Sequence, residues 1–107
     1  MSTWPLVRGQ VIQADIGLDE PKLLVVVSNN RRNERLGSVL CARMTTTAKP
    51  DLPSIVPLEH PEVFVGCVVC DDIVEVFEDE VMAVRGGLSG AAIPVLNDAL
   101  RAALDIP

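Results

Sequence analysis

The chain has 107 residues, of which 49% are hydrophobic, and this is enough to build one folded domain with its own core. Its net charge of −6 argues against a general nucleic-acid-binding protein, and no apolar run approaches the ~20 residues that a membrane helix needs. We expect a single domain over residues 1–107 and no membrane segment. The three cysteines, an odd number in a chain that needs no disulfides, predict a reducing, cytoplasmic environment.

The first half of the chain predicts three strands. Residues 10–15 are short and partly apolar, as expected of a strand, and turn residues follow at 16–21. Residues 22–27 are a continuous, valine-rich apolar run, which is typical of a strand buried on both faces. The polar segment 28–35 predicts a short helical turn capped by its first or second residue, and a third strand follows at residues 38–44.

Prolines and aspartates divide the next part of the chain. A loop with two prolines covers residues 45–53. Residues 55–58 are predicted to form a short edge strand, because Pro57 cannot donate to a ladder. The apolar run 63–70 predicts another strand, which we expect two aspartates at 71–72 to end.

The last part of the chain predicts two short strands and one helix. The strands are expected at residues 73–77 and 81–84, and the helix at 91–104, where apolar residues recur at helical spacing. Six or so short strands followed by one amphipathic C-terminal helix predict a mainly β fold. We expect a small, strongly bent antiparallel sheet that closes toward a barrel, with the helix packed on it.

Charge and hydroxyl groups are unevenly distributed. Residues 1–50 contain seven cations and four acids, a net of +3, whereas residues 51–107 contain two cations and eleven acids, a net of −9. Such a chain can present a basic face to a polyanion, and uneven scattering of surface charge is the equal alternative. Three threonines at 45–47 lie between Arg43 and Lys49 at the end of the third predicted strand. A site of this kind, without histidine, carboxylate or cysteine, suits an anionic substrate that carries its own nucleophile; an ordinary polar loop is the alternative.

Five short segments carry the likeness to a known family. They are Arg-Gly-Gln-Val at 8–11, Lys-Leu-Leu-Val-Val-Val-Ser-Asn-Asn at 22–30, Arg-Met-Thr-Thr-Thr at 43–47, Val-Cys-Asp-Asp-Ile at 69–73, and Gly-Leu-Ser at 87–89 with the helix that follows. Each segment alone is a weak signal, but their order and spacing over about a hundred residues are specific. In this respect the chain resembles the MazF/PemK family of toxin endoribonucleases.

The resemblance implies an SH3-like, CcdB/PemK-type antiparallel barrel that forms a homodimer, with an RNA channel at the dimer interface. It implies an endoribonuclease that needs no metal or other cofactor and cleaves single-stranded RNA at a short sequence. The products would be a 2′,3′-cyclic phosphate and a 5′-hydroxyl. The expected partner is a cognate antitoxin whose acidic, disordered tail occupies the same channel.

The family's catalytic cation and catalytic threonine correspond to Lys22 and Thr45. Because the 2′-hydroxyl of RNA is the nucleophile, these residues need only align it and stabilise charge on the phosphoryl oxygens. Lys22 departs from the pattern, since the family more often has arginine there, followed by a proline where this chain has Leu23. Lysine is a compact point charge and cannot grip a phosphate through two parallel hydrogen bonds. A solvated cation at the start of a strand is the alternative for Lys22.

Further polar residues are candidates for binding RNA. For the arginines of segment 28–35 a solvated loop is the alternative, and we rank Arg43 below Lys22 and Lys49 because we expect its side chain to point away from Thr45. The candidate RNA-binding residues are Arg8, Ser28, Asn29, Arg31, Arg32, Arg35, Arg43, Thr46, Thr47 and Lys49.

Other features of the sequence favour structural roles. Cys67 and Cys70 have a CxxC spacing but lie in an apolar run without a second pair, so we expect buried structural cysteines and no metal site. His60 is expected on a surface turn, and the acidic residues at 71–80 at a solvated edge. Two other functions stay open at this stage. One is a CcdB-like toxin that poisons DNA gyrase without enzymatic activity, and the other is a barrel-type interaction module with weakened catalysis.

Overall fold

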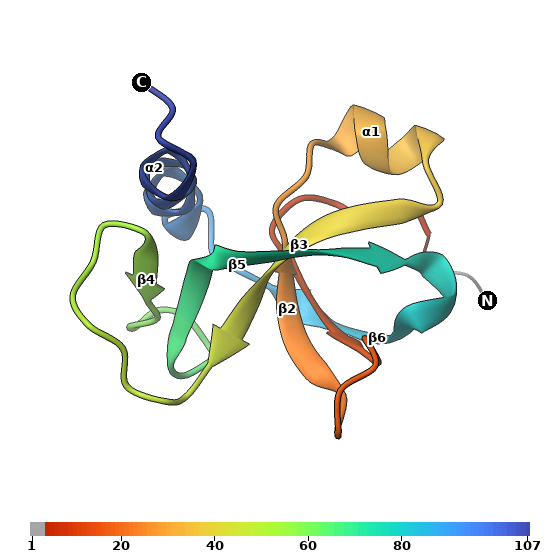
Figure 1. Cartoon of the computed structure of the whole chain (residues 1–107), viewed down its shortest axis with the longest axis horizontal. Coiled ribbons are helices and arrows are strands. Elements are labelled where there is room, and N and C mark those ends of the chain that lie inside the picture. The colour runs from red at the N-terminus through yellow and green to blue at the C-terminus, as the bar shows by residue number, and fades with distance from the viewer. Residues whose placement is uncertain (1–3) are drawn as a thin grey trace.

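The computed structural model describes residues 4–107 of the chain (Figure 1). Six strands form one sheet, and a C-terminal helix packs beside two of them. The elements are β1 (Gln10–Ala14), β2 (Lys22–Val26), α1 (Asn30–Arg35), β3 (Ser38–Thr45), β4 (Ile55–Pro57), β5 (Cys67–Phe77), a short 3₁₀ turn (Glu78–Glu80), β6 (Val81–Gly87) and α2 (Ala92–Leu104). No helix in this part of the chain is both long and apolar enough to cross a membrane.

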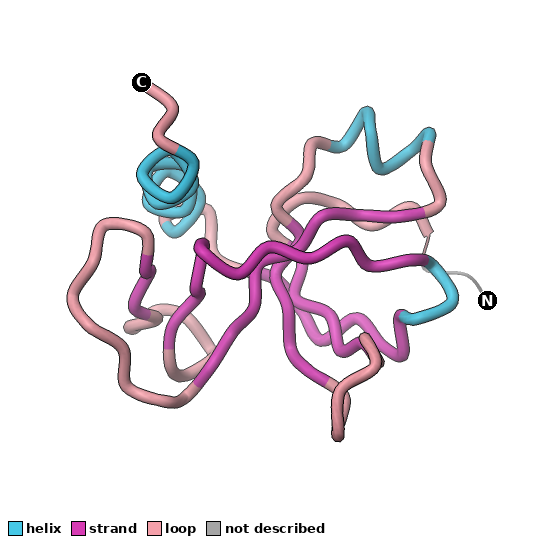
Figure 2. Tube along the Cα trace, in the orientation of Figure 1, coloured by secondary structure: helices cyan, strands magenta, loops and turns pink. Residues whose placement is uncertain are grey.

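The strands follow the order β4-β5-β3-β2-β1-β6, and every neighbouring pair is antiparallel. The trace of the backbone bends strongly, so that β4 and α2 lie on one side of the molecule and α1 and β6 on the other (Figure 2). Strands β4 and β6 remain edges, and the barrel is therefore open. The predicted mainly β fold with a C-terminal helix is confirmed.

Each face of the bent sheet has its own core because strand residues alternate between the faces. Leu24 and Cys41 lie in one apolar cluster, whereas Val25 and Ala42 lie in the other, and all four are fully buried. Helix α2 covers the second cluster with Leu96, which is also fully buried. The apolar run at 22–27 therefore forms a strand that contributes to both cores, as its valine-rich composition predicts.

Strand β5 differs from the prediction at both ends. It begins at Cys67, and the preceding Val63 and Val65 are exposed by 82% and 73% in a loop. It also continues through the two aspartates at 71–72, because the pairing of β3 and β5 shifts register there and the extra residues form a bulge. The prediction that the aspartates end the strand is therefore wrong.

The cysteines are unpaired and buried. Cys41 and Cys70 belong to the cores on opposite faces of the sheet. Burial raises the pKa of the Cys41 thiol to about 12. Burial, assisted by the negative charge of Asp71, raises the pKa of the Cys70 thiol to about 11. These positions confirm the expectation of structural cysteines.

Alkaline pH is predicted to destabilise the fold through these two thiols. In the unfolded chain they ionise near pH 9.0, whereas in the folded chain they stay protonated up to about pH 11 or 12. The unfolded state therefore binds fewer protons in this window, and stability falls as pH rises, by at most about 1.4 kcal/mol per pH unit and thiol. Thermal unfolding between pH 8 and pH 11 measures the slope, and the chain has no tyrosine to add to it. Cys41→Ala should flatten the slope; an unchanged slope in this variant would contradict the assignment.

Candidate active site

The ends of β2 and β3 bring Lys22 and Thr45 together. The two strands are antiparallel, with Leu24 paired to Arg43, so two residues further along Lys22 stands opposite Thr45. Both residues line one surface hollow of about 520 Å³, which we call the Lys22–Thr45 hollow. Residues that are 23 positions apart in the sequence are thus neighbours on the same face of the sheet. The hollow has a second wall of apolar residues from the loop before β5, at 63–65, where Val63 and Val65 are exposed and Phe64 is half-buried against the core.

The Thr45 hydroxyl is held in place by the loop that follows it. Its Oγ1 accepts a hydrogen bond from the backbone N–H of Thr47 at 3.1 Å. The hydroxyl proton is left to donate to another acceptor. On the other side, Gly66 packs against the Thr45 backbone so closely that a Cβ at Gly66 would lie 2.1 Å from the Thr45 carbonyl oxygen. Gly66 also has a φ of +99°, which side-chain-bearing residues rarely adopt.

Lys22 is accessible and has one carboxylate near it. Its Nζ lies 3.5 Å from Oε1 of Glu20, which belongs to the loop between β1 and β2 and lines the same hollow. The Lys22 side chain is 28% exposed and the Glu20 side chain 75% exposed. An ion pair this exposed contributes little to stability. The position of Lys22 beside Thr45 therefore matters for the chemistry of the site more than for the stability of the fold.

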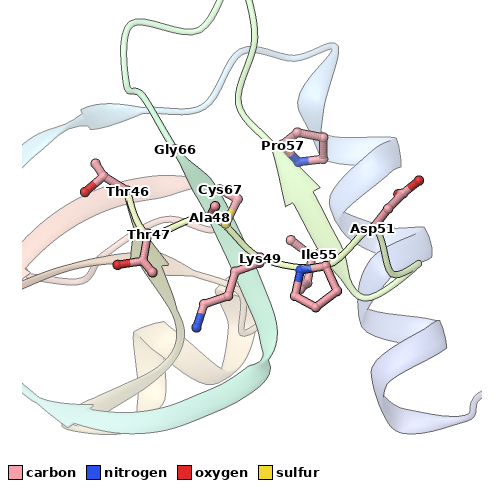
Figure 3. Close-up of a pocket in the computed structure, with 10 residues that line it drawn as sticks. Thr46, Thr47, Ala48, Lys49, Asp51, Ile55, Pro57, Gly66 and Cys67 are labelled. Carbon is pink, nitrogen blue, oxygen red and sulfur yellow. The ribbon is translucent and has the colours of Figure 1, made fainter.

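A second hollow adjoins the first and shares Thr46 and Thr47 with it. It has a volume of about 350 Å³ and is bordered by Lys49, with Ile55 and Cys67 among its apolar lining residues. Figure 3 shows Thr46, Thr47 and Lys49 around one bend of the loop after β3. Lys49 is exposed and forms no ion pair with any residue in the described range 4–107. Two hollows lined by hydroxyls and cations thus lie side by side, and each has one acid in its lining, Glu20 in the first and Asp51 in the second.

Arg43 lies on the same face of β3 as Thr45, because residues two apart on a strand share a face. The expectation that its side chain points away from Thr45 is wrong. Its Nη1 lies 3.2 Å from Oδ2 of Asp72, a residue of the bulge in β5, and the side chain is 33% exposed. Asp72 therefore offsets part of the charge that Arg43 presents.

The arginines of α1 lie away from Lys22. Strand β2 begins at Lys22, and α1 follows its opposite end (Figure 1). Arg31 and Arg35 are exposed on α1, whereas Arg32 donates to the Ser38 carbonyl at 2.8 Å and pairs with Glu75 at 3.5 Å. The sequence placed these arginines among the RNA-binding candidates, but the fold does not bring them to the Lys22–Thr45 hollow.

Three further RNA-binding candidates form hydrogen bonds within the fold around α1. The Ser28 hydroxyl is buried, donating to the Asn33 side chain at 2.6 Å and accepting from the Leu40 N–H at 3.0 Å. Asn29 caps α1 by accepting from the Arg32 N–H at 2.9 Å, as predicted for a residue at this position. The Arg8 side chain donates to the Val27 carbonyl at 2.8 Å, so these groups hold the turn after β2.

Glu20 and the apolar wall at 63–65 were missed by the sequence reasoning. Glu20 could have been found from the sequence, because it stands two residues before Lys22, where a strand begins. The wall could not, because three consecutive apolar residues predict a buried strand. Among the described residues, no three histidine, cysteine, aspartate or glutamate side chains are grouped to hold a metal ion, and His60 is exposed on its turn.

The fold and the site define a small, open β-barrel protein with an exposed site of cations and hydroxyl groups. This combination suits the binding of phosphate groups. The family model described as PemK-like, MazF-like toxin of type II toxin–antitoxin system matches residues 7–104. The chain therefore belongs to this family, and the resemblance inferred from its five short segments is confirmed.

Relatives with known names agree with this. Endoribonuclease MazF1 of Mycobacterium bovis and Endoribonuclease MazF4 of Mycobacterium tuberculosis are each 34% identical over 100 residues, which cover 94% of this chain and 93% of each relative. An endoribonuclease solved in complex with its cognate antitoxin, from a mycobacterial species, has a TM-score of 0.89 at 33% identity and covers 95% of this chain and 97% of its own. A MazE–MazF complex from Deinococcus radiodurans, with a TM-score of 0.78 at 15% identity over 95% and 97% of the chains, supports the fold alone.

Gly66→Ala is predicted to destabilise the protein by about 2 kcal/mol or more, because the substitution combines a positive φ with a backbone clash against Thr45. The matched control is Gly37→Ala, since a Cβ on Gly37 meets nothing within 4 Å. Chemical denaturation of both variants measures the difference. Equal unfolding midpoints for the two variants would show that Gly66 does not constrain Thr45.

Proposed function

We propose that this protein is the toxin of a type II toxin–antitoxin system and that it cleaves single-stranded RNA as an endoribonuclease. Its membership of the family and the names of its relatives support this activity. The observation that carries the proposal is the position of Lys22 and Thr45 on facing strand ends in one accessible hollow.

In the proposed reaction the 2′-oxygen of one nucleotide attacks the adjacent phosphorus and the bond to the 5′-oxygen breaks. The products are a 2′,3′-cyclic phosphate and a 5′-hydroxyl. The Lys22 ammonium stabilises the negative charge that develops on the phosphoryl oxygens. Thr45 donates its free hydroxyl proton to one of these oxygens, since its Oγ1 is already held as an acceptor by the Thr47 N–H. These charges come from side chains, and we therefore propose a reaction that proceeds without a metal ion.

The RNA strand is proposed to continue from the Lys22–Thr45 hollow along the loop after β3. Thr46, Thr47 and Lys49 line the adjoining hollow and supply hydroxyls and a cation for phosphate oxygens. Arg43 lies on the same face and is a further proposed contact. Contacts of RNA with the arginines of α1, or with Arg8, Ser28 and Asn29, stay predictions and are not part of this path.

The proposed partners are a cognate antitoxin and a second copy of the chain. One related structure is a complex with its antitoxin, and we propose that an antitoxin with an acidic tail competes with RNA for the cations of this site. The exposed Val63 and Val65 of the apolar wall and the partly exposed Leu23 supply surface that a homodimer would cover. An RNA substrate fits the cytoplasmic environment expected from the cysteines.

Incubation of the protein with a long RNA in EDTA is expected to give discrete fragments. Their 5′ ends should be labelled directly by polynucleotide kinase, because they carry hydroxyls, and their 3′ ends should carry cyclic phosphates. Mapping the ends identifies the cleavage sequence. Cleavage only after addition of Mg²⁺ would contradict the metal-free reaction. Gyrase inhibition without RNA cleavage would favour a CcdB-like toxin, and neither activity would favour an interaction module.

Lys22→Ala and Thr45→Ala are each expected to lower the rate of RNA cleavage at least about ten-fold, because each removes a group that stabilises the transition state. Thr45→Ser should retain activity, since it keeps the hydroxyl, and Lys22→Arg should retain the part of the rate that depends on the positive charge alone. Arg101→Ala is the matched control, because Arg101 is an exposed cation of α2 whose one ion pair among the described residues is with Asp98. Single-turnover rates measure the effects. Normal cleavage by the folded double variant would exclude both residues from the reaction.

A further inference from the structure

The proposed reaction needs a proton acceptor that Lys22 and Thr45 do not supply. The 2′-hydroxyl must lose its proton as it attacks phosphorus, and the 5′-oxygen must gain one as it leaves. A charged ammonium such as that of Lys22 has no lone pair with which to accept a proton. The Oγ1 of Thr45 already accepts a hydrogen bond from the Thr47 N–H at 3.1 Å. The site therefore holds charge-stabilising groups but lacks a base among these residues.

Glu20 is the single carboxylate among the described residues that line the Lys22–Thr45 hollow. Its Oε1 lies 3.5 Å from the Lys22 Nζ, and its side chain is 75% exposed, so a substrate can reach it. Pro21 separates Glu20 from β2, and its ring restricts the backbone at that point. Glu20 and Lys22 thus contact each other in the lining of the hollow that also contains Thr45.

Resting on the proposed ribonuclease function, we propose that Glu20 is the general base of the reaction. The Glu20 carboxylate takes the proton of the 2′-hydroxyl, the 2′-oxygen forms a bond to phosphorus, and the bond between phosphorus and the 5′-oxygen breaks. The Lys22 ammonium gives a proton to the departing 5′-oxygen. The protonated Glu20 then returns its proton to the neutral Lys22 amine through their direct contact. Both residues are thus reset without water or a metal ion, and every proton is accounted for.

The charged surroundings of Glu20 are simple. Lys22 is the other charged residue that lines the hollow, and Asp19 precedes Glu20 in the exposed loop. Lys49 and Asp51 line the adjoining hollow. The alternative role for Glu20 is that of a counter-ion that phosphate displaces from Lys22. The two roles predict opposite effects, because removal of a mere counter-ion would improve the binding and cleavage of RNA.

The first test compares Glu20→Gln with Asp19→Asn, a matched control that also removes one carboxylate from the same loop. In single-turnover cleavage of an RNA with the mapped site, Glu20→Gln is expected to be slower by about 100-fold. The RNA concentration for half-maximal rate should not rise, which separates a loss of chemistry from a loss of binding. Asp19→Asn should stay within about two-fold of the wild type. An equal or faster rate in Glu20→Gln would overturn the proposal.

The second test uses an RNA in which sulfur replaces the departing 5′-oxygen. Sulfur leaves without being protonated, so this substrate is expected to restore the part of the rate lost in Lys22→Ala that comes from protonating the leaving group. It should not restore the rate of Glu20→Gln, because the 2′-hydroxyl still has to be deprotonated. Equal rescue of both variants would exclude Glu20 as the base. A wild-type protein that cleaves neither RNA would refute the ribonuclease function itself, whereas a cleaving wild type with an active Glu20→Gln would refute this inference alone.

Discussion

The pairing of β2 with β3 is the constraint on which the site depends. Leu24, Val25 and Val26 are fully buried, and the residues that pair with the last two, Ala42 and Cys41, are also fully buried. A slip of one residue would move every one of these side chains to the opposite face and would break both cores. The packing of apolar side chains therefore sets the positions of Lys22 and Thr45, three residues beyond the last pair in which both residues are buried, Val25 and Ala42.

Restrictions on the backbone around Thr45 add to the constraint that the strand register imposes. Thr45 is enclosed between the turn made by Thr47 and the close approach of Gly66, where a side chain has no room. The loops that bring Glu20 and the apolar wall to the hollow are anchored to strands of the same sheet. A site on strand ends that are anchored by two cores is better suited to hold a phosphate in a fixed orientation than one on free loops.

The net charge of −6 and a proposed polyanionic substrate are compatible because the cations are distributed unequally. Arg32 and Arg43 are partly neutralised by Glu75 and Asp72, two acids of the second half of the chain that lie on β5. Lys49 has no such partner among the described ion pairs. Lys22 and Lys49 thus supply positive charge at the two hollows, where Glu20 and Asp51 are the acids in the lining, and the other acids lie elsewhere. This distribution favours binding at one place over general attraction.

Much of this arrangement could be predicted from the sequence, and the failures have physical causes. Apolar periodicity located the strands and α2, and the family resemblance singled out Lys22 and Thr45. The exposure of Val63 and Val65 was not predictable, since only the turn at Gly66 separates them from the buried strand. The continuation of β5 past its aspartates depends on a bulge and on partners that are distant in sequence.

The most direct test of the central claim is an NMR titration with an uncleavable RNA that carries a 2′-deoxy group at the mapped cleavage site. If Lys22 and Thr45 form the RNA site, the largest shifts should occur at the amides of Thr45 and Thr47 and at the side-chain amine of Lys22. The amides of α1 should change less. Shifts confined to α1, with Thr45 and Lys22 unaffected at saturation, would contradict the assignment of the Lys22–Thr45 hollow as the RNA site.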